Sequence, residues 1–105
     1  MSIDDNLKLI VNEVKKIVPL KEAFLFGSFA YGTPNEDSDY DFYFVLDKID
    51  NTTHETLVSI TRVLYKVSSR PFDILIDTKE SFDYRASNQA TLEYKILKDG
   101  VKIYG

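Results

Sequence analysis

Residues 39–46 alternate between the two faces of an extended chain, and this alternation constrains the fold more than any other feature of the sequence. One face carries two carboxylates followed by two larger groups, namely Asp39, Asp41, Tyr43 and Val45. The other face is apolar and largely aromatic, with Tyr40, Phe42, Phe44 and Leu46. A period of two is the spacing of a β-strand and not of a helix. The chain therefore contains a β-sheet, and 39–46 is one of its strands.

The segments on either side of this strand read as a mixture of helices and shorter strands. Apolar residues recur at intervals of three and four over 4–18, which predicts an amphipathic helix ended by Pro19. Helical patterns also cover 52–67, which opens with a capping box, and less regularly about 80–98. Further strands are predicted at 23–26, 72–76 and 101–104, and the turn-rich 27–38 includes one helical turn at 28–31. This order predicts an α/β or α+β fold, with a mixed sheet of about four strands flanked by helices.

The composition limits the kinds of site that this fold can carry. The 105 residues have the length of one domain, 1–105. Seventeen acidic residues against thirteen basic ones give a net charge of -4, which argues against general nucleic-acid binding through a basic surface. With no cysteine and one histidine, thiol catalysis, zinc–thiolate sites and poly-histidine sites are excluded. No apolar run is long enough to span a membrane and no signal peptide is apparent, so we expect a cytoplasmic protein without a membrane partner.

Three polar features fall at the ends of the predicted strands. Gly27-Ser28 follows a buried strand, Asp39 and Asp41 open the next one, and Asp73 is the second residue of a third. Asp39 and Asp41 leave the same face of their strand, with α-carbons about 6–7 Å apart. Asp73 lies on a strand that we expect to be a sheet neighbour. Three converging carboxylates repel one another unless cations are bound, and Mg²⁺ accepts such oxygen ligands together with substrate phosphates.

Gly27-Ser28 supplies groups that suit the phosphates. A glycine lets the backbone approach a ligand closely, and a hydroxyl at the start of a helical turn can hold phosphate oxygens. A strand, Gly-Ser, a turn and a carboxylate pair therefore predict a site for a nucleoside triphosphate with two divalent ions.

These residues resemble the signature of the DNA polymerase beta-like nucleotidyltransferase superfamily, a Gly-Ser followed by Asp-x-Asp. Here Gly27-Ser28 is followed by Asp39-Tyr40-Asp41, and Phe72-Asp73-Ile74-Leu75 is similar to the strand that carries the third carboxylate of that family. The run 92–101 also looks like the ending of its minimal, single-domain members. The resemblance covers nearly the whole chain and implies the nucleotidyltransferase fold.

The resemblance also implies roles for the individual residues. Gly27 and Ser28 would bind the triphosphate, and Ser38 matches a serine that touches phosphate. Asp39, Asp41 and Asp73 would hold two Mg²⁺ ions and form the catalytic set. The implied reaction moves a nucleoside monophosphate, AMP from ATP, onto an acceptor hydroxyl and releases pyrophosphate. Minimal members of the family pair with small HEPN-domain toxins as their antitoxins, so the acceptor is predicted to be a tyrosine of such a partner.

Three other interpretations are compatible with the sequence. The chain could be a non-catalytic antitoxin that neutralises its partner by contact alone. It could instead be a small-molecule nucleotidyltransferase that works as a homo-oligomer, with the acceptor held between subunits. In the plainest interpretation, Gly27 and Ser28 form an ordinary turn, the two aspartates cap a strand, and Asp73 pairs with Arg70.

Overall fold

The structure is a computed structural model that describes residues 3–32 and 38–105. Helices and strands alternate along the chain in the order α1 (Ile3–Lys15), β1 (Leu20–Phe26), α2 (Ser28–Tyr31), β2 (Tyr40–Leu46), α3 (Thr53–Val67), β3 (Phe72–Thr78), α4 (Lys79–Ala86), α5 (Leu92–Asp99) and β4 (Val101–Tyr104). The predicted strands are all present, and the helical turn after β1 is α2. The part of the turn-rich segment at 33–37 lies outside the described residues.

The four strands form one mixed sheet in the order β3-β2-β1-β4. Strand β1 pairs antiparallel with both β2 and β4, whereas β2 and β3 run parallel. A parallel pair needs a crossover connection, and α3 provides it between β2 and β3. The prediction of an α/β fold with a mixed four-stranded sheet is confirmed.

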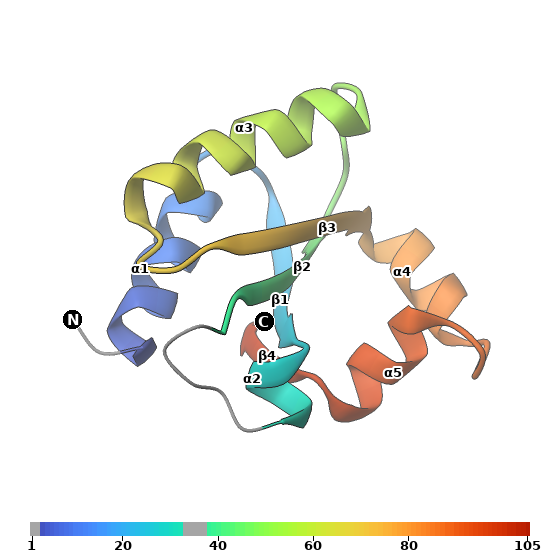
Figure 1. The fold of residues 1–105 in the computed structure, drawn as a ribbon. Helices are drawn as coiled ribbons and strands as arrows, with labels where there is room; N and C mark the ends of the chain where they lie inside the picture. The colour runs from blue at the N-terminus through green and yellow to red at the C-terminus, as the bar shows by residue number, and fades with distance from the viewer. Residues whose placement is uncertain (1–2, 33–37) are drawn as a thin grey trace.

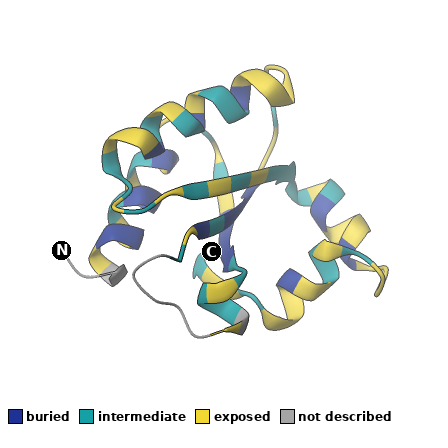
Figure 2. Ribbon diagram, in the orientation of Figure 1, coloured by how far each residue is buried: buried dark blue, intermediate teal, exposed yellow. Residues whose placement is uncertain are grey.

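The helices cover the two faces of the sheet separately (Figure 1). On one face, α1 and α3 pack over apolar side chains that include Leu25, Phe42 and Phe44. On the other face, Phe82 and Ala86 of α4 and Ile96 of α5 pack against Phe24, Tyr43 and Val45. Strands β1 and β2 are therefore buried on both sides, whereas β3 has only exposed and half-buried residues (Figure 2). None of the helices within the described residues is long and apolar enough to cross a membrane.

Two predicted helix boundaries are wrong. The first helix ends at Lys15 rather than at residue 18, because residues 16–18 form a turn before Pro19 and Ile17 is 45% exposed. The helix predicted at 80–98 is two helices, α4 and α5, separated by residues 87–91. There the Asn88 side chain accepts a hydrogen bond from the amide of Ala90, and the Thr91 hydroxyl accepts one from the amide of Tyr94 as the N-cap of α5.

A charged network ties β1 to its neighbours on the α4 side of the sheet. The Glu22 side chain is only 10% exposed and pairs with Lys79, the first residue of α4, and with Lys102 of β4 at 2.8 Å. Burial alone would raise the pKa of Glu22, but the hydrogen bonds and charges of Lys102 and Lys79 outweigh it and lower the pKa below 4.5. A carboxylate with a lowered pKa in the folded state adds stability above its ordinary pKa. That contribution is lost as the pH falls through the lowered value.

We expect Glu22→Gln to reduce the free energy of unfolding at pH 7 by about 1–3 kcal/mol, since two lysines lose their charged acceptor. Urea unfolding monitored by circular dichroism measures this loss, which should shrink at about pH 3, where Glu22 is increasingly protonated. Glu13→Gln is the control, because Glu13 pairs with the exposed Lys16 within one helix and should cost at most about 0.5 kcal/mol. Equal losses for the two variants would contradict a structural role for the Glu22 network.

Candidate active site

Gly27 and Asp41 lie in direct contact at the end of β1. Gly27 has a φ of 73°, a backbone conformation that side chains disfavour, and a Cβ placed on it would lie 2.0 Å from Asp41 Oδ2. Both the backbone angle and the missing side chain are therefore needed for the Asp41 carboxylate to occupy this position. Ser28 follows immediately as the first residue of α2 and is exposed.

The parallel pairing of β2 and β3 brings the third aspartate to the first two. Asp41 and Asp73 are register partners, and on these strands the same face continues through Tyr43 and Leu75. Asp73 and Asp39 are exposed, while Asp41 is half-buried. Burial raises the pKa of Asp41 above its ordinary value, and the negative charges of Asp73 and Asp39 raise it further. The structure thus places the three carboxylates where they repel one another.

A buried tyrosine fixes the strand end that carries Asp39 and Asp41. Tyr40, between them, is fully buried and points to the opposite face, where its ring lies 5.1 Å from that of Phe29 in α2. Its hydroxyl donates to Asn6 Oδ1 at 3.3 Å. The same Asn6 oxygen accepts hydrogen bonds from the amide and hydroxyl of Ser69 at 3.0 and 2.9 Å. Asn6 of α1 therefore connects the start of β2 to the loop before β3.

Arg70, in the loop before β3, also contacts the residue before Asp39 and the short helix α2. Its Nη1 donates to the carbonyl oxygen of Ser38 at 3.1 Å, and its guanidinium lies 5.2 Å from the centre of the Phe29 ring. Arg70 thus holds together the residue before Asp39, the short helix after Gly27 and the approach to β3. Ser38 is half-buried at this junction.

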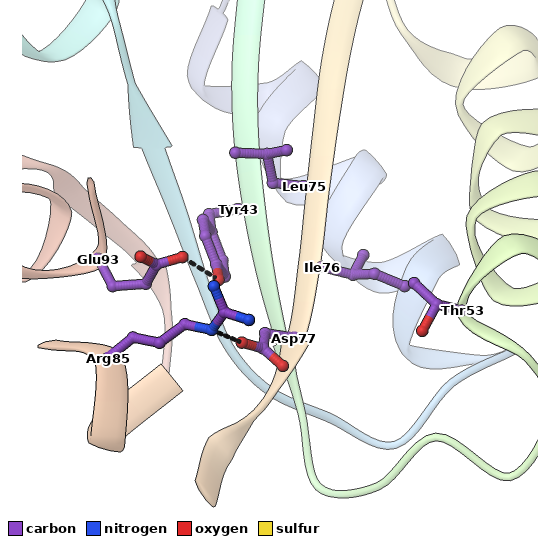
Figure 3. A pocket seen from close by; sticks show the side chains of 7 residues that line it. All are labelled: Tyr43, Thr53, Leu75, Ile76, Asp77, Arg85 and Glu93. Atoms are coloured by element: carbon purple, nitrogen blue, oxygen red, sulfur yellow. Dashed lines mark hydrogen bonds and ion pairs between the residues drawn. The ribbon is translucent and has the colours of Figure 1, made fainter. Parts of the chain in front are cut away.

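A pocket of about 310 Å³ lies farther along the same face of the sheet, which we call the β3 pocket (Figure 3). Its lining residues on this face are Tyr43, Leu75, Asp77, Arg85 and Glu93, and around the edge of β3 it reaches Ile76 and Thr53. Arg85 Nε lies 3.4 Å from Asp77 Oδ2, and the Tyr43 hydroxyl donates to Glu93 at 2.8 Å. Burial and the Glu93 carboxylate raise the pKa of Tyr43 well above its ordinary range, so its hydroxyl stays protonated.

The carboxylates match the ligand chemistry of Mg²⁺, which prefers oxygen donors and keeps positions for water and phosphate. Burial raises the pKa of Asp41, and the charges of Asp73 and Asp39 raise it further, so a bound cation would stabilise the ionised carboxylates. Within residues 3–32 and 38–105, no three acidic or histidine side chains are already close enough to enclose a metal ion. The donor set therefore fits Mg²⁺ that is partly coordinated by a ligand, rather than a closed site made by the protein alone.

The sequence located part of this arrangement and missed the rest. Gly27, Asp39, Asp41 and Asp73 come together, with Ser28 and Ser38 on the adjoining turn and strand end. Asn6 was missed, although its spacing of four from Ile10 places a polar residue on the apolar face of the first helix, which is a readable signal. The contact between Tyr43 and Glu93 joins residues 50 positions apart and has no signal in the sequence.

Known proteins share the fold of this chain. A family model described as a nucleotidyltransferase domain matches residues 7–102. A crystal structure of a toxin-antitoxin with AMP-PNP is 17% identical with a TM-score of 0.66, and the match covers 99% of this chain and 74% of that one. A mutant of the toxin-antitoxin MntA-HpeT is 16% identical with a TM-score of 0.63, with coverages of 94% and 73%. At these identities the two structures show a shared fold. No curated protein matches the sequence.

Proposed function

The chain belongs to the nucleotidyltransferase domain family, and on that premise we propose that it transfers AMP from ATP to an acceptor hydroxyl and releases pyrophosphate. The observation that carries this proposal is the meeting of Asp41 and Asp73 in register, with Gly27 against the Asp41 carboxylate. Crowded carboxylates beside an open turn are unfavourable in the protein alone and favourable once a cation and phosphates are bound.

In this proposal each residue acts on a particular part of the reactants. The Gly27 backbone and the Ser28 hydroxyl bind the β- and γ-phosphates, with Ser38 nearby. Asp39, Asp41 and Asp73 would hold Mg²⁺, which neutralises charge on the phosphates and lowers the pKa of a bound hydroxyl. Asp73 accepts the proton of the acceptor hydroxyl as general base. The acceptor oxygen forms a bond to the α-phosphorus, the bond from that phosphorus to the β-phosphate oxygen breaks, and its electron pair leaves with pyrophosphate.

The proposed acceptor is a tyrosine on a partner toxin, of the HEPN class. Both solved structures described above are toxin-antitoxin proteins, and one of them was crystallised with the ATP analogue AMP-PNP. Their shared fold covers almost the whole of this chain, which supports the proposal that this chain also acts together with a toxin. The described elements all belong to the sheet and the helices that cover it. An acceptor hydroxyl supplied by a partner protein suits such a fold.

The test is to incubate the protein with Mg²⁺, ATP labelled in the α-phosphate and the product of the adjacent gene. We expect the label on a tyrosine of that product, identified by mass spectrometry as a gain of AMP. ATP labelled in the γ-phosphate is the matched control and should leave no label on protein. Neutralisation of the partner without any label would favour the non-catalytic antitoxin, and label on a small molecule would favour the other transferase interpretation.

A further inference from the structure

The β3 pocket begins one step along the strands from the carboxylates. Tyr43 and Leu75 are register partners, as are Asp41 and Asp73, and both pairs lie on one face. Same-face residues of a strand are about 7 Å apart. Leu75 is 41% exposed and Asp73 is exposed, so this part of the face is open to a ligand.

The Gly27–Ser28 turn lies beside the carboxylates, next to Asp41 and toward the start of β2. Strand β1 runs antiparallel to β2 with Phe26 opposite Asp41, so the chain that leaves β1 continues toward the start of β2. The β3 pocket lies toward the end of β2 and β3, where α4 and α5 contribute Arg85 and Glu93. Along β2 the turn therefore lies toward the start of the strand, level with Asp39 and Asp41, and the pocket lies toward the end of the strand.

This arrangement matters because the attacking and leaving oxygens of a phosphoryl transfer are roughly in line across the phosphorus. If the departing phosphates lie at Gly27 and Ser28, the attacking hydroxyl must approach from the opposite side of the α-phosphorus. We propose that the β3 pocket seats the side chain that carries the acceptor hydroxyl. The inference rests on the proposed function. It assigns the pocket to the acceptor and not to the nucleoside, because the bond between the nucleoside and the α-phosphorus does not lie on the line through the attacking and leaving oxygens.

The lining indicates the kind of side chain that fits. A volume of about 310 Å³ is at the low end for ligand pockets, so it suits a group the size of one side chain. Leu75 offers an apolar surface on this face, where the four polar groups already bond in pairs, Tyr43 with Glu93 and Arg85 with Asp77. A ring can lie on Leu75 with its hydroxyl directed about 7 Å along the strand toward Asp73. A tyrosine has that reach, whereas the hydroxyl of serine lies one carbon from its backbone.

The experiment fills the pocket without adding charge beside the phosphates. Leu75→Trp is compared with wild type, with Leu75→Met, which keeps the apolar volume, and with Ile17→Trp, an equally exposed position beyond α1 that is 45% exposed. Each protein is given Mg²⁺, α-labelled ATP and the adjacent-gene product, and the rate of labelling is measured. The thermal stabilisation by Mg²⁺ and ATP is recorded in parallel, since it reports nucleotide binding without an acceptor.

We expect Leu75→Trp to label the partner at least about 100-fold more slowly, because the hydroxyl loses its position for attack. Its thermal response to Mg²⁺ and ATP should equal that of wild type, and Leu75→Met and Ile17→Trp should label normally. Normal labelling by Leu75→Trp would overturn the pocket assignment and leave the proposed function standing. If Leu75→Trp loses both the thermal response and the labelling, the pocket binds the nucleotide instead of the acceptor. Absence of labelling by wild type would overturn both.

Discussion

Replacing Asp39 and Asp41 by asparagine should abolish the stabilisation that Mg²⁺ and ATP give to the protein. A ligand present at 100 times its dissociation constant adds about 2.7 kcal/mol to the free energy of unfolding. For a domain of this size that corresponds to a rise in Tm of about 10 °C. The double variant loses charged oxygens beside Gly27, so differential scanning fluorimetry should show no rise with Mg²⁺ and ATP.

The same variant should melt higher than wild type when no ligand is present. Burial and the charges of Asp73 and Asp39 raise the pKa of Asp41 in the folded state, so its ionised form opposes folding. For a carboxyl with a raised pKa this cost is complete above the raised value and disappears as the pH falls below the ordinary one, 3.8. The difference in Tm should therefore be present at pH 7 and absent at about pH 3.

Asp47→Asn with Asp50→Asn is the matched control for both measurements. These two aspartates follow β2 at its other end, are more than half exposed, and contact Lys21 and Lys48 at 4.0 and 3.6 Å. Their replacement should leave the response to Mg²⁺ and ATP intact. A full response in the Asp39 and Asp41 double variant would contradict the assignment of the site.

The second large effect concerns Asp73, whose replacement by asparagine should separate nucleotide binding from transfer. The proposed triphosphate ligands Asp39, Asp41 and Ser28 are unchanged in this variant, so a substantial thermal response to Mg²⁺ and ATP should remain. Transfer of label to the partner should fall by about 10²–10⁴-fold, because the acceptor hydroxyl loses its proposed general base. Quench-flow or filter-binding assays of labelled partner measure the rate, with Asp50→Asn as an exposed control that keeps it.

In cells that produce the proposed toxin partner, Asp73→Asn should fail to protect although the two proteins still associate. Co-purification through a tag on one protein shows the association, and colony counts show the protection. Full protection by Asp73→Asn, at wild-type expression and without AMP on the partner, would rule out transfer as the means of neutralisation.

The parts of the fold that were predictable from sequence are those set by short-range patterns. The alternation of 39–46 identified β2 and the shared face of Asp39 and Asp41. The capping box identified the start of α3, where the Thr52 hydroxyl accepts from the Glu55 amide at 3.1 Å. By contrast, the gap between α4 and α5 depends on side-chain bonds of Asn88 and Thr91 that compete with the helix, and apolar spacing carries no information about them.

The parts that were not predictable depend on residues far apart in the sequence. Strand β1 extends back to Leu20 and includes Glu22, whose burial is tolerated only because Lys79 and Lys102 meet it. The β3 pocket likewise forms from two strands and three helices that no local pattern brings together. Asp73 could be placed on a neighbouring strand, but its pairing with Asp41 is a property of the register that only the assembled sheet defines.

The parallel pairing of β2 with β3 also sets when the site can form during folding. Asp41 and Asp73 meet only after the chain has passed through the whole of α3 and returned to the sheet, a long-range closure that folds slowly. A nascent chain that has not yet emerged through β3 has the Gly27–Ser28 turn and β2 but no third carboxylate. The set of three carboxylates is therefore complete only once β3 has paired with β2.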